Sequence, residues 1–121
     1  MSNLGTNTRL VDGAAIIHPG AYLNQLGGEV IEDRCSQLIG EGIRRIVINF
    51  EETELINSIG ISILLGIIET VNEADGMLVL SNLNSSSREL FEMLGLLSHI
   101  RVAGTEEEAL GLLCDPVETV A

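Results

Sequence analysis

Few residues of this chain have the types and spacing that catalysis requires. His18 and His99 are the only histidines among 121 residues and both adjoin apolar residues, so a metal site or a Ser-His triad has few candidate groups. Cys35 and Cys114 lie far apart in apolar patterns, which favours buried thiols in a reducing cytoplasm over a disulfide or a redox pair. CxxC, HExxH, Walker-loop and GxGxxG motifs are absent from the sequence. We therefore expect no enzyme, no metal and no cofactor.

One serine has a more informative position. Ser58 stands where a long apolar helix is expected to begin, and that helix runs to about residue 74. A serine there can cap the helix by accepting a backbone N–H, but Asn57 is an equally good cap, and the sequence alone does not say which residue fills the position. The alternative is that Ser58 is a phosphorylation target, because backbone N–H groups and the helix dipole favour an anion at this end.

The two faces of this helix differ in character. At about 3.6 residues per turn, one face is expected to be core, and it carries Ile61, Leu64, Ile68 and Val71. The opposite face is small or polar apart from one leucine, and it carries Ser58, Ser62, Leu65, Gly66, Glu69, Asn72 and Glu73. Such a face lets the backbone of another protein approach closely and favours docking. The alternative is that Gly60 and Gly66 only let the helix pack tightly against its own fold.

Composition restricts the partners that this helix could meet. The chain has 18 acidic residues against six arginines, and its formal charge of −12 disfavours nucleic acid and anionic membranes. The charge would favour a partner with a basic patch, or merely confer solubility. The longest apolar run, 63–68, is far shorter than the roughly 20 residues that span a bilayer, and residues 1–8 lack a signal-peptide pattern. We expect a cytoplasmic protein that binds neither nucleic acid nor membrane.

The surrounding pattern predicts the elements that position this helix. Strands are expected at 9–11, 14–17, 21–23 as an edge that continues the second, 44–50, 77–80 and 100–103. Helices are expected at 29–41, from Asn57 or Ser58 to about 74, from Ser86 to about 97 unless Gly95 ends it earlier, and from Thr105 to before Pro116. Gly27-Gly28 is interpreted as an interruption before the first helix, and the pairs Ser86/Glu89 and Thr105/Glu108 are interpreted as capping boxes.

This order predicts an α/β fold. A starting hairpin followed by β-α alternation implies a mixed sheet of four to five strands, packed by four helices. With only 2% aromatic residues, the core must be aliphatic. The continuous β-branched run at 44–50 indicates a strand that is buried on both faces.

The segments 46–50, 57–60, 77–83 and 86–96 together resemble the anti-sigma factor antagonist family of bacteria, the small stand-alone STAS domains. The resemblance extends from about residue 9 to 113, which implies one STAS domain at 9–115 between tails at 1–8 and 116–121. It implies a protein that docks onto an anti-sigma factor, which is also a serine kinase of the histidine-kinase-like ATPase fold, and so releases a sigma factor. The kinase then phosphorylates a residue at the start of the second helix, which breaks the complex.

Carried onto this chain, the family's phosphoacceptor falls on Ser58, and Gly60 matches the glycine of its motif. Two positions depart from the pattern: Asn57 replaces the usual aspartate, and Ile59 stands where serine or threonine is frequent. Loss of the carboxylate could slow or abolish phosphorylation, and Ser62 is a weaker backup acceptor. The alternative function is a STAS adaptor or scaffold without a switch, in a signalling complex or a lipid-transport complex.

The resemblance also suggests a partner surface. The 19–24 segment looks like the family's strand-end loop, with Asn24 where an aspartate is frequent and Tyr22 either an exposed contact or a core residue. The expected partner-binding residues are Asn24, Asn57, Ser58, Ile59, Gly60, Ser62, Leu65, Gly66 and Glu69. The acidic run 106–108 is expected to be a solvated first helical turn. The oligomeric state is expected to be a monomer or a weak dimer.

Overall fold

The computed structural model describes residues 7–98 and 100–114. Five strands form one sheet in the order β1-β2-β4-β6-β7. These strands are β1 (Asn7–Val11), β2 (Ala14–His18), β4 (Arg45–Asn49), β6 (Met77–Ser81) and β7 (Arg101–Ala103). Only the β1–β2 pair is antiparallel, so the predicted mixed sheet with an opening hairpin is confirmed.

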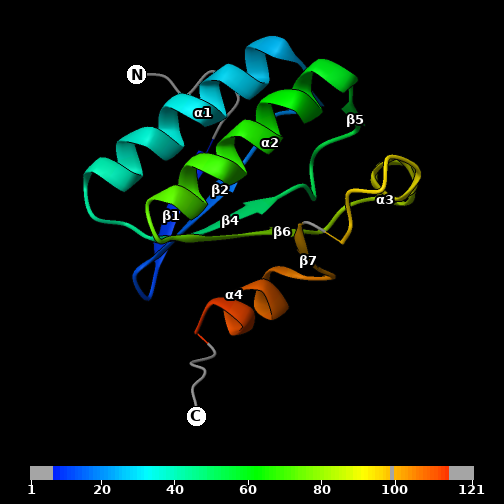
Figure 1. Cartoon of the computed structure of the whole chain (residues 1–121). Helices are drawn as coiled ribbons and strands as arrows, with labels where there is room; N and C mark the ends of the chain where they lie inside the picture. The colour runs from blue at the N-terminus through cyan, green and yellow to red at the C-terminus, as the bar shows by residue number, and fades with distance from the viewer. Residues whose placement is uncertain (1–6, 99, 115–121) are drawn as a thin grey trace.

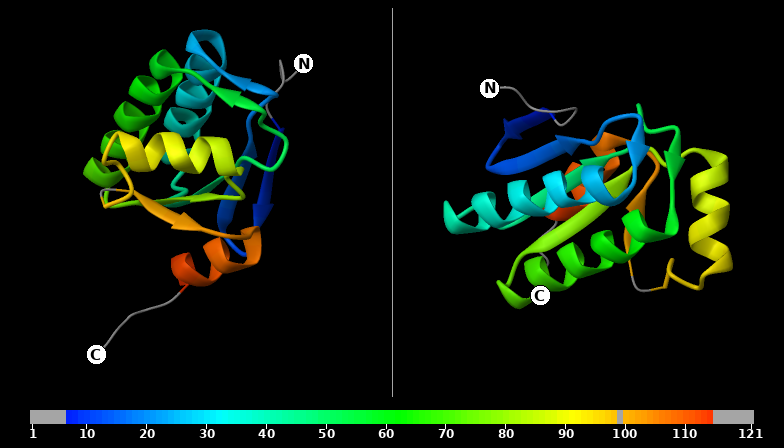
Figure 2. Two further views of the ribbon diagram at one scale, coloured as in Figure 1. Left: turned by 90° about the vertical axis from the view of Figure 1, so that its right-hand side faces the viewer. Right: turned by 90° about the horizontal axis from the view of Figure 1, so that it is seen from above.

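Four helices pack around this sheet, as predicted: α1 (Gln25–Gly40), α2 (Ser58–Glu73), α3 (Ser85–Met93) and α4 (Glu106–Cys114). Helices α1 and α2 lie side by side on one face, while α4 covers the other (Figure 1). Helix α3 stands beyond the end of the sheet, next to the start of α2 (Figure 2). The described domain is therefore an α/β fold in three layers.

Strand β4 shows how the aliphatic sequence builds both interfaces. Ile46 and Ile48 point into the core beneath α1 and α2, whereas Val47 points toward α4, and all three are fully buried. Alternate residues of a strand face opposite sides of its sheet, so a central strand needs apolar residues at every position. The predicted doubly buried strand is confirmed.

A second, very small sheet was not fully foreseen. Residues 21–23 do not extend β2 as an edge; instead β3 (Tyr22–Leu23) pairs in parallel with β5 (Leu55–Ile56). The sequence predicts no strand at 55–56, because a strand of two residues has no periodicity. This pair lies directly before α1 and α2, so it sets where both helices begin.

Two helix starts differ from the prediction. Helix α1 begins at Gln25, not at 29, with Asn24 as its N-cap, so the glycine pair lies inside its first turn. The pair is needed for close packing: a Cβ on Gly27 would lie 2.8 Å from the Tyr22 carbonyl oxygen, and one on Gly28 would lie 3.0 Å from the Ile63 side chain. Glycine was thus misinterpreted as an interruption.

The Ser86/Glu89 capping box is wrong, because Asn84 caps α3 by accepting the N–H of Ser87 at 2.8 Å. The helix ends early at Met93, followed by Gly95 with a φ of +71°, as the alternative had allowed.

The second capping box is largely confirmed. The Thr105 hydroxyl accepts the Glu108 N–H at 3.1 Å, and the Glu108 carboxylate accepts the N–H of Gly104, one residue before the expected partner, at 2.8 Å.

The buried face of α2 also differs in one residue from the prediction. Ile67 is buried where Ile68 was expected, and Ile68 is only partly covered.

Candidate functional site

The first turn of α2 is built around Asn57. Its side-chain oxygen accepts the N–H of Gly60 at 2.8 Å, and its own N–H donates to the Leu23 carbonyl at 3.0 Å. Asn57, and not Ser58, is therefore the N-cap, which decides the choice that the sequence left open. The interpretation of Ser58 as a helix cap is wrong.

Gly60 holds this turn against the small sheet. A Cβ at this position would lie 2.2 Å from the Leu23 carbonyl oxygen, so only glycine lets α2 approach β3 so closely. Gly60 is buried and lies outside the exposed face of the helix. For this glycine, packing against its own fold is the better interpretation. For Gly66 it is not, because a Cβ there would meet nothing within 4 Å.

Ser58 is left as an exposed hydroxyl at the first position of α2. The first N–H groups of a helix have no acceptor within it. Asn57 satisfies that of Gly60, which leaves those of Ser58 and Ile59 available to an anion. No acidic residue stands in this first turn, so the positive end of the helix dipole is not neutralised there.

Exposed apolar side chains lie on the small sheet and on the first turns of α1 and α2, the elements that adjoin this serine. Tyr22 pairs in register with Leu55 across the small sheet, and both side chains are more than half exposed. Leu26 in the first turn of α1 and Ile59 in that of α2 are also exposed. The interpretation of Tyr22 as a core residue is wrong. We refer to Tyr22, Leu26, Leu55, Ser58 and Ile59 together as the Ser58 surface.

The other predicted partner-binding residues fall into two places. Asn24 is exposed, and its side-chain oxygen caps α1 by accepting the N–H of Gly27 at 2.9 Å. Further along α2, a shallow hollow of about 460 Å³ is lined by Ser62, Leu65, Gly66 and Glu69, together with Ile68, Asn72 and Ile100. The structure thus brings four of the nine predicted residues into one hollow.

The acidic run at the start of α4 is not simply solvated. A carboxylate oxygen of Glu106 accepts hydrogen bonds from Arg9 at 2.7 Å and from the buried Asn49 amide at 2.9 Å. Burial by itself would raise the pKa of Glu106, but these hydrogen bonds, with the charges of Arg9 and His18, hold the pKa below its ordinary value. Glu106 therefore ties α4 to β1 and β4, which corrects the prediction for this residue.

The described residues offer neither a reactive thiol nor a metal-binding cluster. Burial, with a smaller contribution from Glu32, raises the pKa of the Cys35 thiol to about 12, so it stays protonated at neutral pH. Within 7–98 and 100–114, no three or more His, Cys, Asp or Glu residues gather where they could hold a metal ion. His99 and the Cys114 side chain lie outside the part that the structure describes.

Residues 7–98 and 100–114 contain no helix long and apolar enough to cross a membrane.

Sequence reasoning missed Leu26 and Leu55, because isolated exposed leucines have no distinguishing pattern. The sequence offered Asn57 as a cap, but the equivalent caps of α1 and α3 were missed, in which Asn24 and Asn84 accept the N–H three residues on. The signal was present for Asn24 and Asn57, which stand directly before helical apolar patterns, but not for Asn84, which is followed by three serines.

Comparison with known proteins identifies the family to which this fold belongs. A family model described as the STAS domain matches residues 6–109, which is most of the chain. The chain belongs to the STAS domain family. The predicted resemblance to the STAS domains of anti-sigma factor antagonists, and the fold expected from it, are confirmed.

Relatives of this STAS domain are regulatory proteins. BtrV of Bordetella bronchiseptica, assigned as an anti-sigma factor antagonist, is 30% identical over 99 residues, or 82% of this chain and 85% of BtrV. The phosphorylated form of the Bacillus cell fate determinant SpoIIAA is 27% identical with a TM-score of 0.68, covering 88% of this chain and 97% of SpoIIAA. TM1081 from Thermotoga maritima has the same fold, with a TM-score of 0.82 at 16% identity over 93% of this chain and 97% of TM1081.

Proposed function

We propose that this STAS domain is a cytoplasmic anti-sigma factor antagonist, not an enzyme, which phosphorylation of Ser58 inactivates. Its partner is an anti-sigma factor that is also a serine kinase of the histidine-kinase-like ATPase fold. Binding through the Ser58 surface and the outer face of α2 displaces the sigma factor from that partner. Phosphate transfer to Ser58 then ends the binding.

The observation that carries this proposal is the division of work between Asn57 and Ser58. Because Asn57 caps the helix, the Ser58 hydroxyl is exposed and has no structural task that its modification would disturb. It also lies among exposed apolar side chains, which is the composition of a binding surface and not of an ordinary solvated one.

The relatives support the same assignment. BtrV is assigned as an anti-sigma factor antagonist. SpoIIAA, which is 27% identical to this chain, has been solved in a phosphorylated form. Asn57 differs from the aspartate of the family pattern. The amide already serves as the N-cap, so the departure removes a charge beside Ser58 without removing the cap.

The effect of the phosphate follows from charge and position. A phosphoserine adds about −1.5 to −2 at pH 7, to a chain whose formal charge is already −12. The fold tolerates this anion, because the N–H groups at the start of α2 are available to it. A partner packed against Ile59 and Leu55 would have to desolvate it. Each 1.4 kcal/mol of that cost weakens binding about tenfold.

The test uses the serine kinase encoded nearest to the gene of this chain. The two proteins are incubated with ATP and magnesium, and intact mass should reveal one phosphate. The Ser58→Ala variant should take up none, while the matched Ser62→Ala variant should still take up one. In the presence of ADP, Ser58→Ala should bind the kinase as tightly as the unmodified protein, and Ser58→Glu at least tenfold more weakly.

Uptake of phosphate by Ser58→Ala would overturn the assignment of the acceptor. If the kinase binds the chain but no cognate kinase transfers phosphate to it, the switch fails and a non-phosphorylated STAS adaptor or scaffold becomes the function. Such a result would trace the loss of the switch to the neutral Asn57, which the Asn57→Asp variant would test by restoring phosphate uptake.

A further inference from the structure

A groove separates the small sheet from α3. It has a volume of about 280 Å³ and is open to solvent. Its walls are mostly apolar: Leu55 and Ile56 come from β5, and Leu90 and Met93 come from α3. None of the residues that line it belongs to α2 or to the hollow beside Gly66, and Leu55 is the one residue that the groove shares with the Ser58 surface. We call it the α3 groove.

Two of these apolar side chains are unusually exposed. Met93 is 79% exposed and Leu55 is 63% exposed. Single exposed apolar residues are ordinary, but here both side chains line one groove, which is the arrangement of a docking surface. Methionine suits a docking surface, because its unbranched and polarizable side chain adapts to different partners.

The backbone around the groove is held in place by internal contacts. The Thr53 hydroxyl donates to the Gly20 carbonyl at 3.0 Å, and the Asn84 amide donates to the Thr53 carbonyl at 3.4 Å. The same Asn84 caps α3, whose Phe91 is fully buried in the core. Both walls are thus anchored to the fold, and the groove is preformed.

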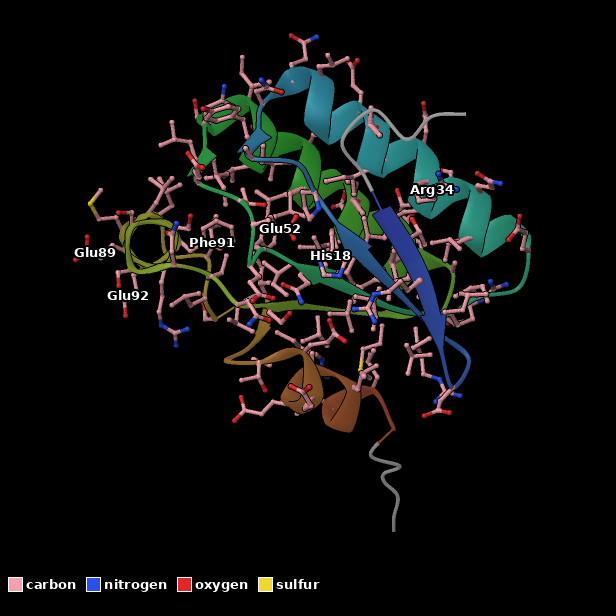
Figure 3. All side chains as sticks on the ribbon, turned by 180° about the vertical axis from the view of Figure 1, so that it is seen from behind. His18, Arg34, Glu52, Glu89, Phe91 and Glu92 are labelled. Atoms are coloured by element: carbon pink, nitrogen blue, oxygen red, sulfur yellow. The ribbon has the colours of Figure 1, made fainter. Side chains whose placement is uncertain are left out.

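The rim of the groove is strongly acidic. Glu54 and Glu89 line it, and Glu51, Glu52 and Glu92 are exposed on the two segments that form its walls. Glu89 and Glu92 project outward from α3, whereas Phe91 points into the molecule, and Glu52 lies on the segment between β4 and β5 (Figure 3). Arg88 is the one basic residue of α3. A cationic ligand would therefore be attracted to this groove.

We propose that the α3 groove binds a positively charged amphipathic segment of a partner protein. One large apolar side chain of that segment enters between Leu55 and Met93, and flanking Lys or Arg residues pair with Glu54 and Glu89. The charge of the rim sets the orientation and the association rate more than the affinity, which comes from the apolar anchor. This binding goes beyond the Ser58 switch and requires neither phosphate nor nucleotide.

The size and charge of the groove argue against other occupants. A volume of about 280 Å³ holds one or two side chains and lies below the roughly 300–1,000 Å³ of typical small-molecule sites. Anionic lipids and nucleic acids would be repelled by the rim. A second copy of this chain carries a formal charge of −12 and would be repelled as well.

The test uses the full chain and a fluorescent peptide of about 16 residues, designed as a helix with a leucine stripe and Lys/Arg on its polar face. A second peptide keeps the leucine stripe but carries Glu on the polar face. The basic peptide should bind at least tenfold more tightly than the acidic one, and added salt should weaken its binding. Equal binding of the two peptides would overturn the role of the rim.

Variants separate the groove from the overall charge of the protein. Met93→Lys and the double variant Glu54→Lys/Glu89→Lys should each weaken binding of the basic peptide at least tenfold. The matched controls are Leu10→Lys and the double variant Glu29→Lys/Glu41→Lys, which change exposed residues of β1, of α1 and of the α1 C-cap, away from the groove. The controls should change binding less than twofold, and a loss equal to that of the groove variants would contradict the proposal.

Two further outcomes remain decisive. If sedimentation shows a dimer that Met93→Lys disrupts, the occupant is a second copy, and the proposal is wrong. The Ser58→Ala variant should bind the basic peptide like the unmodified chain. Because the peptide assay needs neither kinase nor ATP, its failure leaves the Ser58 switch standing, and failure of the switch leaves the α3 groove standing.

Discussion

The first turns of α2 and α4 have opposite designs. In α4 the first three residues are glutamates, and Glu106 and Glu108 are both bound by partners of their own chain. In α2 the first turn contains no acid, the cap is the neutral Asn57, and Ser58 and Ile59 are exposed. A carboxylate in the first turn stabilises a helix by about 0.3–1 kcal/mol. The α4 terminus has this stabilisation and the α2 terminus does not.

The N-terminus of α4 has a structural role, whereas the N-terminus of α2 is free to bind a ligand. The two helices lie on opposite faces of the sheet, so they have separate surroundings (Figure 1). The α4 terminus is closed by Arg9, Asn49 and its own backbone, and leaves little for a ligand to bind. The α2 terminus retains free N–H groups and apolar neighbours, which is what a phosphorylated docking surface needs.

The largest expected effect comes from disturbing how α2 is seated. In Gly60→Ala the new Cβ would meet the Leu23 carbonyl at 2.2 Å, so the helix or β3 must shift, at a cost of about 3 kcal/mol. In Gly66→Ala the Cβ meets nothing within 4 Å, and replacing a helical glycine should stabilise by up to about 1 kcal/mol. Urea unfolding followed by circular dichroism measures both.

These two variants are matched in chemistry and in helix, and differ only in what surrounds the glycine. Equal changes in the free energy of unfolding for both would show that Gly60 is not the contact that seats α2. The Gly66→Ala variant also serves the proposed function. It should fold well yet bind the kinase more weakly if the hollow beside Gly66 is part of the docking face.

A smaller effect is expected from the cap itself. Asn57→Ala removes the acceptor of the Gly60 N–H and should destabilise the protein by about 1 kcal/mol. Asn57→Asp keeps an acceptor and adds a charge that favours the helix dipole, so it should be as stable as the natural chain or slightly more stable at pH 7. Ser58→Ala should change the stability by less than about 0.5 kcal/mol, because its hydroxyl caps nothing. If Ser58→Ala lost as much stability as Asn57→Ala, Ser58 and not Asn57 would be the N-cap of α2.

Some features of β4 and of the helix termini can be predicted from the sequence alone. Strand β4 and the start of α2 were predicted because each depends on a local pattern: β-branched residues in succession, and an asparagine or serine before a helical apolar stripe. The Thr105 cap was predicted for the same reason. Features that rest on neighbours within three or four residues can be recognised in a single chain.

Features that rest on distant residues could not be recognised. Strand β5 exists because Leu55 and Ile56 pair with Tyr22 and Leu23, more than 30 residues away. Gly28 marks contact with Ile63 and not a turn, and a glycine has the same appearance in a sequence in either case. The α3 groove depends on the placement of a whole helix beside β5. The position of Ser58 and the exposure of Ile59 could therefore be predicted and Tyr22 could be offered as a contact, but Leu26 and Leu55 could not be recognised.

The smallest expected effect concerns the closed terminus of α4. In Glu106→Gln the ion pair with Arg9 is lost, while the new amide can still contact Asn49. The Arg9 side chain is 48% exposed, so the free energy of unfolding at pH 7 should fall by no more than about 1 kcal/mol. The matched control is Glu107→Gln, which makes the same charge change at the next residue, for which the described residues provide no ion pair or hydrogen bond.

The pH dependence of this difference tests its cause. The pKa of Glu106 is lowered in the folded chain from about 4.5, so the unfolded chain binds the proton more readily. The stabilisation is therefore complete above about pH 5.5, shrinks as the pH falls below 4.5, and disappears below the folded pKa. Unfolding of the natural chain and Glu106→Gln between pH 3 and 7 should show curves that converge in acid. Parallel curves would mean that Glu106 is no more than another solvated carboxylate, and the contrast between the two helix termini would then rest on α2 alone.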